Sequence, residues 1–543
     1  MTALPDADLA WSPAAGQTAR HEAFLAAYPA YRHTAVLDRL RAEEYGYLDA
    51  QGHVYLDYTG AGLPARAQLA AHAARVRSRC FGNPHSENPT SEASTELIER
   101  ARRQVLEHFS APPDEYAAIF TANASAACRI VAEAYPFGPR SRLVLTYDNH
   151  NSVNGIREFA RIRGAVTEYV PFSSGDLRVS DEVVAAALDR PGPQSAAAIA
   201  RAIRSGVAPW AARGRRARRQ RSLGRKWAQD PHRSVTGLTG GPPQRRRGLF
   251  AYPAQSNFTG VQHPLRWIET AHTNGYDVLL DAAAFAPANR LDLSVVKPDF
   301  VPVSWYKVFG YPTGVGCLIA RREALARLWR PWFSGGTINA VSIQGDWHVL
   351  AGDEARFEDG TLNFLNIPDI EFGLSWVNGI GLDVIHERVT GLTGWMLGRL
   401  AAMRHRGGEP MALIYGPAGT YGRGGTIAFN LLDPRGRIVD ERAVARDTSA
   451  AGISVRTGCF CNPGAGEGAF GITRDHVIRA FRQRARTVDE YLNSLGLASG
   501  GAIRVSVGVA STLADVERFC SFLEETYRDQ PADAAGLAPR LRC

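Results

Sequence analysis

Short apolar runs alternate with longer amphipathic stretches along most of this chain. The runs have the length of strands, and the stretches between them have the length of helices. The predicted strands are 54–58, 118–121, 142–146, 166–169, 249–252, 277–281, 300–304 and 315–320. The predicted helices in this part are 64–79, 91–109, 125–134 and 152–163. Because strands that alternate with helices form parallel βαβ units, we expect an α/β fold in which helices cover both faces of a mainly parallel sheet.

Beyond residue 372 the order of helices and strands changes. The predicted elements there are helix 372–406, strands 426–430 and 454–456, helix 475–495, strand 503–506 and helix 513–527. This mixture predicts a smaller α+β domain. We therefore divide the chain into an N-terminal arm and helix (1–50), a large domain (51–370), a small C-terminal domain (371–530) and a frayed tail (531–543).

A basic segment, residues 189–248, interrupts the large domain. Its arginine runs, Gly-Pro punctuation and weak apolar periodicity predict low complexity and disorder. The window 201–247 holds fourteen Lys or Arg and one acidic residue, so the net charge of +8 becomes −5 when this window is set aside. Part of it, 213–225, could bind nucleic acid as a basic arm, but it has few interleaved aromatic residues. We therefore expect nucleic acid not to be the main partner.

The composition is that of a soluble globular protein, with 45% hydrophobic and 21% charged residues. No apolar run approaches the roughly 20 residues that cross a membrane. The seven cysteines are few and odd in number, which does not predict a disulfide framework. The N-terminus lacks the pattern of a signal peptide, so we expect a cytoplasmic protein.

Lysine is almost absent from this sequence. Of the 62 basic residues only three are lysines, namely Lys226, Lys297 and Lys307. A lysine retained against such a bias is expected where arginine cannot replace its amine chemistry. Lys226 lies in the basic window and Lys297 precedes a proline, whereas Lys307 directly follows an apolar strand. We expect the Lys307 amine to be partly desolvated, with a lowered pKa, and to act as nucleophile and base.

Polar residues at other strand ends suggest a partner for that amine. Asp281 ends an apolar strand, where a carboxylate needs a cation such as a protonated pyridine nitrogen. The turn 121–125 leads into a helix, whose first N–H groups and dipole can hold a phosphate. His150 follows a third strand and could stack on a ring. Each feature alone fits an ordinary structural role equally well, as a loop aspartate, a helix cap or a buried histidine.

Taken together and in this order, these residues resemble the class V aminotransferase group of fold-type I pyridoxal-phosphate (PLP) enzymes, which includes the cysteine desulfurases. The resemblance extends in particular to the desulfurase domain of the molybdenum cofactor sulfurases. It spans about 50–525, apart from 189–248. The segments that carry it are 55–58 (YLDY), 82–86 (GNPHS), 149–150 (NH), 252–258 (YPAQSNF), 280–281 (LD), 304–307 (SWYK), 309–314 (FGYPTG), 356–361 (RFEDGT) and 456–464 (RTGCFCNPG).

The resemblance implies a large domain with a seven-stranded, mainly parallel sheet that binds PLP, and a homodimer. Lys307 would form the Schiff base, Asp281 would pair with the pyridine nitrogen, and His150 would stack on the ring. The other implied cofactor residues are Asn123, Ala124, Ser125 and Ser304 around the phosphate, Thr361 reaching the phosphate of a partner subunit, and Asn257 facing the phenolic oxygen.

The resemblance also implies the reaction. Arg456 would bind the carboxylate of L-cysteine, and Cys461 would accept its sulfur as a persulfide while alanine is released. The loop 458–464, rich in Gly and Pro, could carry the thiol to the substrate. We expect no metal site, because the Cys459-x-Cys461 pair lacks two further ligands.

Departures from the family pattern leave parts of this interpretation open. Related desulfurases usually carry glutamine where Ala284 stands and histidine where Tyr306 stands. The chain also ends near the end of the desulfurase domain, so the sulfur acceptor is unknown, and the molybdenum cofactor is one candidate. The alternative is another class V enzyme, an aminotransferase, epimerase or C–S lyase acting on an amino-acid-derived metabolite, which would not need Cys461.

Overall fold

The computed structural model describes residues 17–84, 86–192, 246–482, 487–497, 499–534 and 536–540. Most of the predicted basic segment, the first part of the predicted N-terminal arm and the last three residues of the tail lie outside these ranges. Among the helices that are described, none combines the length and the apolar character needed to span a bilayer.

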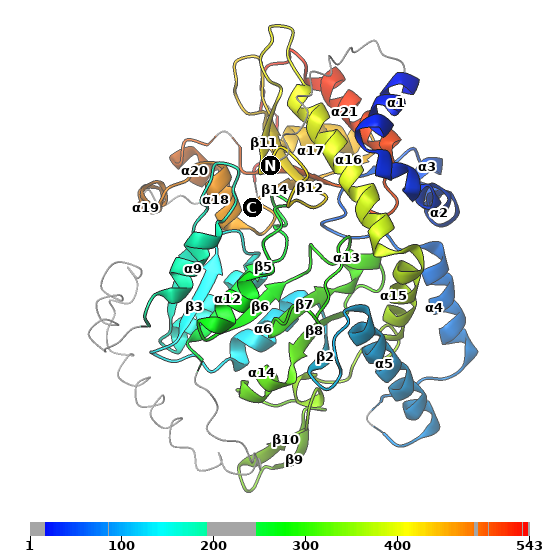
Figure 1. The fold of residues 1–543 in the computed structure, drawn as a ribbon, viewed down its shortest axis with the longest axis vertical. Coiled ribbons are helices and arrows are strands. Elements are labelled where there is room, and N and C mark those ends of the chain that lie inside the picture. Colours follow the sequence, from blue (N-terminus) through cyan, green and yellow to red (C-terminus); the bar gives the residue numbers. More distant parts are fainter. Residues whose placement is uncertain are drawn as a thin grey trace.

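A seven-stranded sheet forms the centre of the molecule (Figure 1). Its order is β2-β8-β7-β6-β5-β3-β4, and only β8 runs antiparallel to its neighbours. The bounds are β2 (Tyr116–Thr121), β3 (Arg142–Thr146), β4 (Val166–Val170), β5 (Gly248–Pro253), β6 (Tyr276–Asp281), β7 (Phe300–Ser304) and β8 (Gly316–Arg321). The mainly parallel sheet predicted from the sequence is therefore confirmed.

Helices cover both faces of this sheet, which explains why its strands are nearly continuous apolar runs. In β5, Phe250 and Tyr252 pack into the cluster on one face, while Leu249 and Ala251 pack into the cluster on the other. The helices of this part are α4 (Arg66–Ser78), α5 (Pro89–His108), α6 (Ala124–Ala134), α7 (Asn151–Asn154), α8 (Ile156–Ile162), α9 (Asp181–Asp189), α12 (Trp267–Thr273), α13 (Trp305–Phe309), α14 (Arg322–Arg327) and η3 (Ala355–Phe357).

The C-terminal part contains a four-stranded antiparallel sheet of order β11-β12-β15-β14. Its strands are β11 (Ala412–Tyr415), β12 (Thr426–Leu431), β14 (Arg456–Gly458) and β15 (Ala502–Ser506). Its helices are α15 (Pro368–Ile380), α16 (Leu382–Ala402), α17 (Glu441–Ala450), α18 (Pro463–Ala469), α19 (Arg474–Arg482), α20 (Val488–Ser494) and α21 (Leu513–Tyr527). α19 and α20 occupy the predicted helix 475–495, and residues 483–486 between them are not described.

The single helix predicted for 372–406 is wrong, because the structure has two helices, α15 and α16, that meet at Gly381. Gly381 has φ +95, a conformation that breaks the helical hydrogen-bond ladder and that glycine adopts without steric cost. The apolar pattern continues across the break because both helices bury one face, so periodicity alone did not reveal it.

The N-terminal segment packs against the C-terminal part rather than against the large sheet (Figure 1). It comprises α1 (Gln17–Ala27), η1 (Pro29–Thr34), α2 (Val36–Tyr45), α3 (Tyr47–Ala50) and β1 (Val54–Tyr55). Arg388 of α16 is fully buried, donates to the carbonyl oxygen of Thr34 at 2.7 Å and pairs with Asp38 at 2.7 Å. β1 pairs in parallel with β13 (Ile453–Ser454), which brings the residues after β1 to the start of β14.

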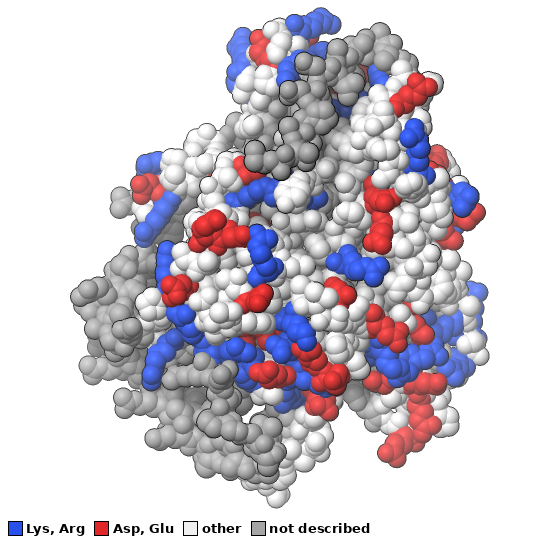
Figure 2. Space-filling model, in the orientation of Figure 1, with Lys and Arg blue, Asp and Glu red and all other residues white. Residues whose placement is uncertain are grey.

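A β-hairpin that the sequence did not predict projects from the segment between α14 and α15, at the bottom of Figure 1. It consists of β9 (Ile338–Ser342) and β10 (Trp347–Leu350). Its apolar side chains are unusually exposed, among them Ile343 at 90% and Trp347 at 43%. On the face drawn in Figure 2, the described basic and acidic side chains are interspersed rather than gathered into one basic surface.

Candidate active site

The carboxyl ends of six strands, all but β8, lie at one edge of the large sheet. Pro253 lies opposite Asp281, and both Thr121 and Ser304 lie opposite Gly316. Ligands of open α/β sheets bind at this edge. A cavity of about 400 Å³ lies there, lined by residues that include Asn123, Ala124, Ser125, His150, Asn257, Asp281, Ser304, Tyr306 and Lys307. The structure thus brings together most of the residues singled out from the sequence.

The start of α6 forms the corner of this cavity that is suited to a phosphate, and we call it the phosphate-like corner. Asn123 caps the helix by accepting from the backbone N–H of Ala126 at 3.0 Å, and the backbone N–H of Ala124 donates to Ser304 Oγ at 3.0 Å. Ser125 shares a hydrogen bond of 2.6 Å with Ser152. Hydroxyls and a helix N-terminus on one side of a cavity are suited to an anion.

Gly316 of β8 makes the close approach of this corner possible. A Cβ atom at position 316 would lie 2.7 Å from Asn123 Cα and 2.7 Å from the Val303 carbonyl oxygen. Any larger residue would therefore push the α6 turn away from Ser304.

Lys307 and Asp281 enter the cavity from neighbouring strands. Asp281 is the last residue of β6 and accepts from the backbone N–H of Ala283 at 3.0 Å. Lys307 follows β7 in the short helix α13. Burial lowers the pKa of the Lys307 amine, the charges of Arg504 and Arg456 lower it further, and the Asp281 carboxylate acts in the opposite direction. A lowered pKa gives more neutral amine, which is the nucleophilic form.

His150 faces the same cavity from the end of β3. Its Nδ1 accepts from the backbone N–H of Ser152 at 3.1 Å, which caps α7 and fixes the ring. Burial lowers the pKa of the His150 imidazole, and Asp281 partly offsets this. A neutral, fixed imidazole at this place can lie against a flat ring.

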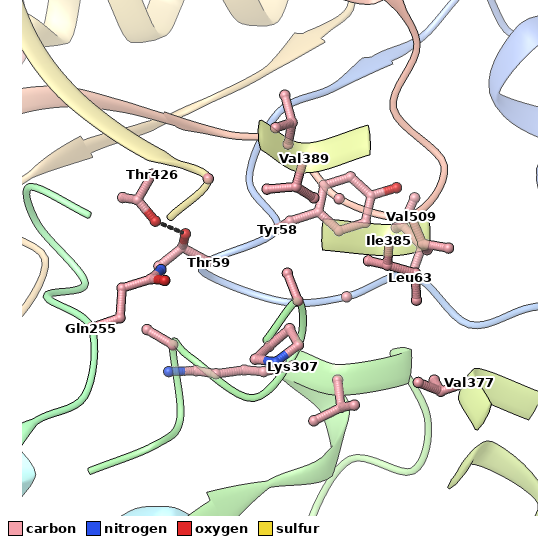
Figure 3. Close-up of a pocket in the computed structure, with 18 of the residues that line it drawn as sticks. Tyr58, Thr59, Leu63, Gln255, Lys307, Val377, Ile385, Val389, Thr426 and Val509 are labelled. Atoms are coloured by element: carbon pink, nitrogen blue, oxygen red, sulfur yellow. Dashed lines mark hydrogen bonds between the residues drawn. The ribbon is translucent and has the colours of Figure 1, made fainter. Parts of the chain in front are cut away.

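A smaller, mostly apolar cavity of about 40 Å³ adjoins Lys307 (Figure 3). Its polar end carries Gln255 and a 2.6 Å hydrogen bond between Thr59 and Thr426. The remaining labelled lining residues are Tyr58, Leu63, Val377, Ile385, Val389 and Val509. Side chains from the segment after β1, from α15 and α16 and from the segment after β15 therefore close the site on the side of the C-terminal part.

Cys461 lies in an exposed loop, and two neighbouring segments, residues 148–151 and the turn that contains Asn257, hold that loop in place. The backbone N–H of Asn151 donates to the Cys461 carbonyl oxygen at 2.7 Å, and Asn257 Nδ2 donates to that of Phe460 at 2.8 Å. Asn462 Nδ2 donates to the Asp148 carbonyl oxygen at 2.7 Å. The loop expected to carry the thiol is thus tied to the residues on either side of His150 and to Asn257.

The turn that presents Cys461 has an unusual backbone. Phe460 and Cys461 both have φ +54, in the left-handed region that non-glycine residues seldom adopt. The backbone N–H of Asn462 donates to the Cys459 carbonyl oxygen at 3.0 Å and closes the turn. Such a conformation persists only where the surroundings hold it, and it often marks a functional loop.

Two arginines lie near this loop, and the sequence indicated only one of them. Arg456 starts β14 and its side chain is 47% exposed, whereas Arg504 of β15 is 3% exposed. Both bind the carboxylate of Asp57. Burial lowers the pKa of Arg504 to about 10, and the Asp57 carboxylate acts in the opposite direction. The signal that could have revealed Arg504 is a cation within an otherwise apolar strand, which is costly without a purpose.

Thr361 does not line the main cavity. It accepts a hydrogen bond from Asn83 at 3.3 Å and lines a separate cavity of about 300 Å³. The two cavities share Ala122 and Gly314 as lining residues. Thr361 therefore lies next to the phosphate-like corner without facing into it.

Comparisons with known proteins agree with this arrangement. The sequence model of the family Aminotransferase class-V matches residues 54–189 and 244–519. Molybdenum cofactor sulfurases of Solanum lycopersicum and Homo sapiens are each 32% identical over 518 residues, covering 93% and 92% of this chain but 59% and 52% of the relatives. The chain thus spans about half to three fifths of the length of these curated relatives.

Solved structures share the fold. A cysteine desulfurase from Thermococcus onnurineus NA1 in the apo form superposes with a TM-score of 0.67 at 21% identity, covering 91% of this chain and 98% of that chain. A cysteine desulfurase from Escherichia coli superposes with a TM-score of 0.61 at 20% identity, covering 90% and 98%.

Proposed function

Because the chain belongs to the aminotransferase class-V family, we propose that it is a PLP-dependent cysteine desulfurase that transfers sulfur from L-cysteine to Cys461. The sulfurase relatives and the desulfurase fold support this proposal. The overall reaction balances as L-cysteine plus the Cys461 thiol giving L-alanine plus a Cys461 persulfide.

The donors around the main cavity suit PLP. Its phosphate would lie at the start of α6 between Ser125 and Ser304, and Asp281 would face its pyridine nitrogen. His150 would lie against its ring, Asn257 would face its phenolic oxygen, and Lys307 would bind it covalently. The close approach that Gly316 allows at Asn123 and the volume of about 400 Å³ support this fit.

Side chains of the protein would bind the substrate, move its proton and accept its sulfur. Bound PLP supplies an electron sink that eases loss of the substrate Cα proton. Lys307, with its lowered pKa, would take that proton and return it to carbon. Arg456 and Arg504 would bind the substrate carboxylate. The Cys461 thiolate would then attack the substrate sulfur, so that the carbon–sulfur bond breaks as a sulfur–sulfur bond forms.

One observation carries this proposal: an exposed cysteine sits on a loop that is hydrogen-bonded to Asp148 and Asn151, which flank His150, and to Asn257. In the proposed reaction this loop would bring the thiol to a substrate bound at Lys307 and, because Cys461 is exposed, would also present it to a sulfur acceptor in solvent. The reducing conditions of the cytoplasm would keep it a thiol, and Cys461 is free in the structure.

The test is alanine formation by protein reconstituted with PLP. We expect Cys461→Ala to abolish alanine release from L-cysteine while the visible absorption of bound PLP persists. Cys80→Ala changes another exposed cysteine and should keep the wild-type rate. Full turnover by Cys461→Ala would instead favour an aminotransferase, epimerase or C–S lyase, because these reactions need no acceptor thiol.

We also propose that the active enzyme is a homodimer. The hairpin β9–β10 exposes Ile343 and Trp347, and nearby Trp332 is 47% exposed. Trp332 and Thr361 line the cavity next to the phosphate-like corner, so a second copy covering this surface could place its Thr361 at the first copy's cofactor. Light scattering should give twice the chain mass, and a monomeric mass for fully active protein would contradict the proposal.

A further inference from the structure

A single carboxylate holds both arginines near the Cys461 loop. Arg456 Nε lies 3.0 Å from Asp57 Oδ2 and 3.1 Å from Oδ1, and Arg456 Nη2 lies 2.6 Å from Oδ2. Arg504 Nη2 lies 3.0 Å from Asp57 Oδ1. The edge of Arg456 that would bind a carboxylate in a two-pronged manner is therefore already bound to one.

The local backbone is shaped around this pair. Asp57 follows β1, and its backbone bridges to Ser506 at the end of β15. A Cβ atom at Gly60 would lie 2.5 Å from Asp57 Oδ2 and closer still to the Arg456 guanidinium. Gly60 thus leaves the space in which Asp57 and Arg456 meet.

The two arginines differ in how firmly they are held. Arg504 is buried, donates to the Asn257 carbonyl oxygen at 3.1 Å and lies 4.8 Å from the centre of the Phe460 ring. Arg456 is half exposed and, within the described residues, Asp57 is the only hydrogen-bond or ion-pair partner of its side chain. Arg456 can therefore leave Asp57 at low cost, because a half-exposed ion pair is weak and solvent replaces it easily.

The charges leave room for one more anion. Two guanidinium groups and one carboxylate carry a net charge of +1, so a single α-carboxylate would neutralise the group. Without Asp57 the two arginines would repel each other and Arg504 would be a buried cation with no counter-charge. Asp57 thus keeps the arginines together while no substrate is present.

We propose that Asp57 is a positioning residue that stands in for the substrate carboxylate on Arg456 and gives up Arg456 when substrate binds. This inference rests on the proposed function, since it assigns the two arginines to the substrate carboxylate. Asp57 keeps Arg504 throughout, and only Arg456 exchanges one carboxylate for another. The exchange costs binding energy, so Asp57 weakens the hold on both substrate and product carboxylates.

The test is binding of the product L-alanine to PLP-reconstituted protein, measured by calorimetry so that the result does not depend on turnover or on cofactor absorbance. We expect Asp57→Asn, which keeps the shape but removes the competing charge, to lower the Kd of L-alanine about three- to fivefold. L-Alaninamide lacks the carboxylate and should bind both proteins equally. Damage to the site would weaken L-alanine binding, so the sign of the change separates exchange from a purely structural role.

Matched variants complete this experiment. Asp49→Asn also removes a carboxylate from a two-pronged pair, with Arg41, but outside the three cavities, and should leave the Kd unchanged. Gly60→Ala forces Asp57 and Arg456 apart with both charges kept, so it should tighten L-alanine binding and provides a second route if Asp57→Asn does not fold. In the double variant with Arg456→Gln the tightening should disappear.

The possible failures can be told apart. Unchanged or weaker L-alanine binding in Asp57→Asn and Gly60→Ala would overturn the exchange, even if the protein desulfurates cysteine. If the variants bind L-alanine more tightly, as expected, but the wild-type protein forms no alanine from L-cysteine, only the proposed function would be contradicted.

Discussion

The two sides of the candidate site are built in different ways. On the Lys307 side, the residues stand at the carboxyl ends of neighbouring strands in one buried sheet, and their order follows from the βαβ connections. On the Cys461 side, the residues come from loops and short strands of the C-terminal part. These meet the segment after β1 through contacts such as Asp57–Arg456, which lie 399 residues apart in the chain.

This difference separates a rigid half of the site from an adjustable half. The sheet positions Lys307 and Asp281 through continuous buried packing, so local substitutions cannot easily move them. The Cys461 loop depends instead on a few hydrogen bonds from Asn151, Asn257 and Asn462 and on two left-handed residues. We therefore expect substitutions on the two sides to fail in different ways.

Lys307→Ala should have the largest effect. It removes the amine that would bind PLP and move the proton, so alanine formation should fall by about 10²–10⁴-fold and PLP should be lost on dialysis. Cys461→Ala should lose turnover but keep PLP. If Lys307→Ala retained PLP as firmly as Cys461→Ala does, the distinction between the two sides of the site would be wrong.

Lys297→Ala is the matched control for this prediction. Lys297 is the other lysine within the described residues, and it lies on the surface with its amine 2.6 Å from Glu115. Cofactor retention and turnover should both remain at the wild-type level in this variant.

The same division decides how much the sequence could predict. The residues on the Lys307 side could be predicted from the sequence because each buried apolar strand ends in a polar residue, as at Asp281 and Ser304. Arg504 was missed because its role depends on Asp57 and on the Phe460 ring, neither of which is near it in the chain. The break at Gly381 and the exposed hairpin β9–β10 were also missed, since apolar periodicity does not report a turn or an uncovered surface.

Asn462→Ala should have an intermediate effect. Asn462 is fully buried, caps α18 by accepting from Ala465, and donates to Asp148 and Asn257. Its loss removes a cap worth about 1 kcal/mol and leaves buried acceptors unpaired at about 1–3 kcal/mol each. The Cys461 loop should then be less firmly positioned, and alanine formation should fall by about 10–100-fold with PLP retained.

A second asparagine cap separates this effect from general destabilisation. Asn88 caps α5 by accepting from the N–H groups of Thr90 and Ser91, but it makes no contact with the Cys461 loop. Asn88→Ala should lower the melting temperature, as Asn462→Ala does, while alanine formation stays near the wild-type rate. Equal rate losses in the two variants would show that the anchoring of the loop is unimportant.

The smallest effect should be a change in the titration of Lys307 caused by the other side of the site. The positive charge of Arg456 lowers the pKa of Lys307, whereas the negative charge of Asp281 raises it. Arg456→Gln should therefore raise the Lys307 pKa and move the appearance of neutral amine to higher pH. Asp281→Asn should move it to lower pH. The effect of Arg456 should weaken in salt, because that side chain is half exposed.

The scarcity of lysine makes this titration measurable. After ¹³C-methylation of PLP-free protein, the spectrum contains side-chain signals from only three lysines, and Lys307 is assigned by its loss in Lys307→Ala. The Lys297 signal, from the surface beside Glu115, should be the same in every variant. If Arg456→Gln and Asp281→Asn moved the Lys307 titration in the same direction, the charges would not act as the structure indicates. Shifts of opposite sign would show that the adjustable half of the site tunes the amine that the rigid half holds.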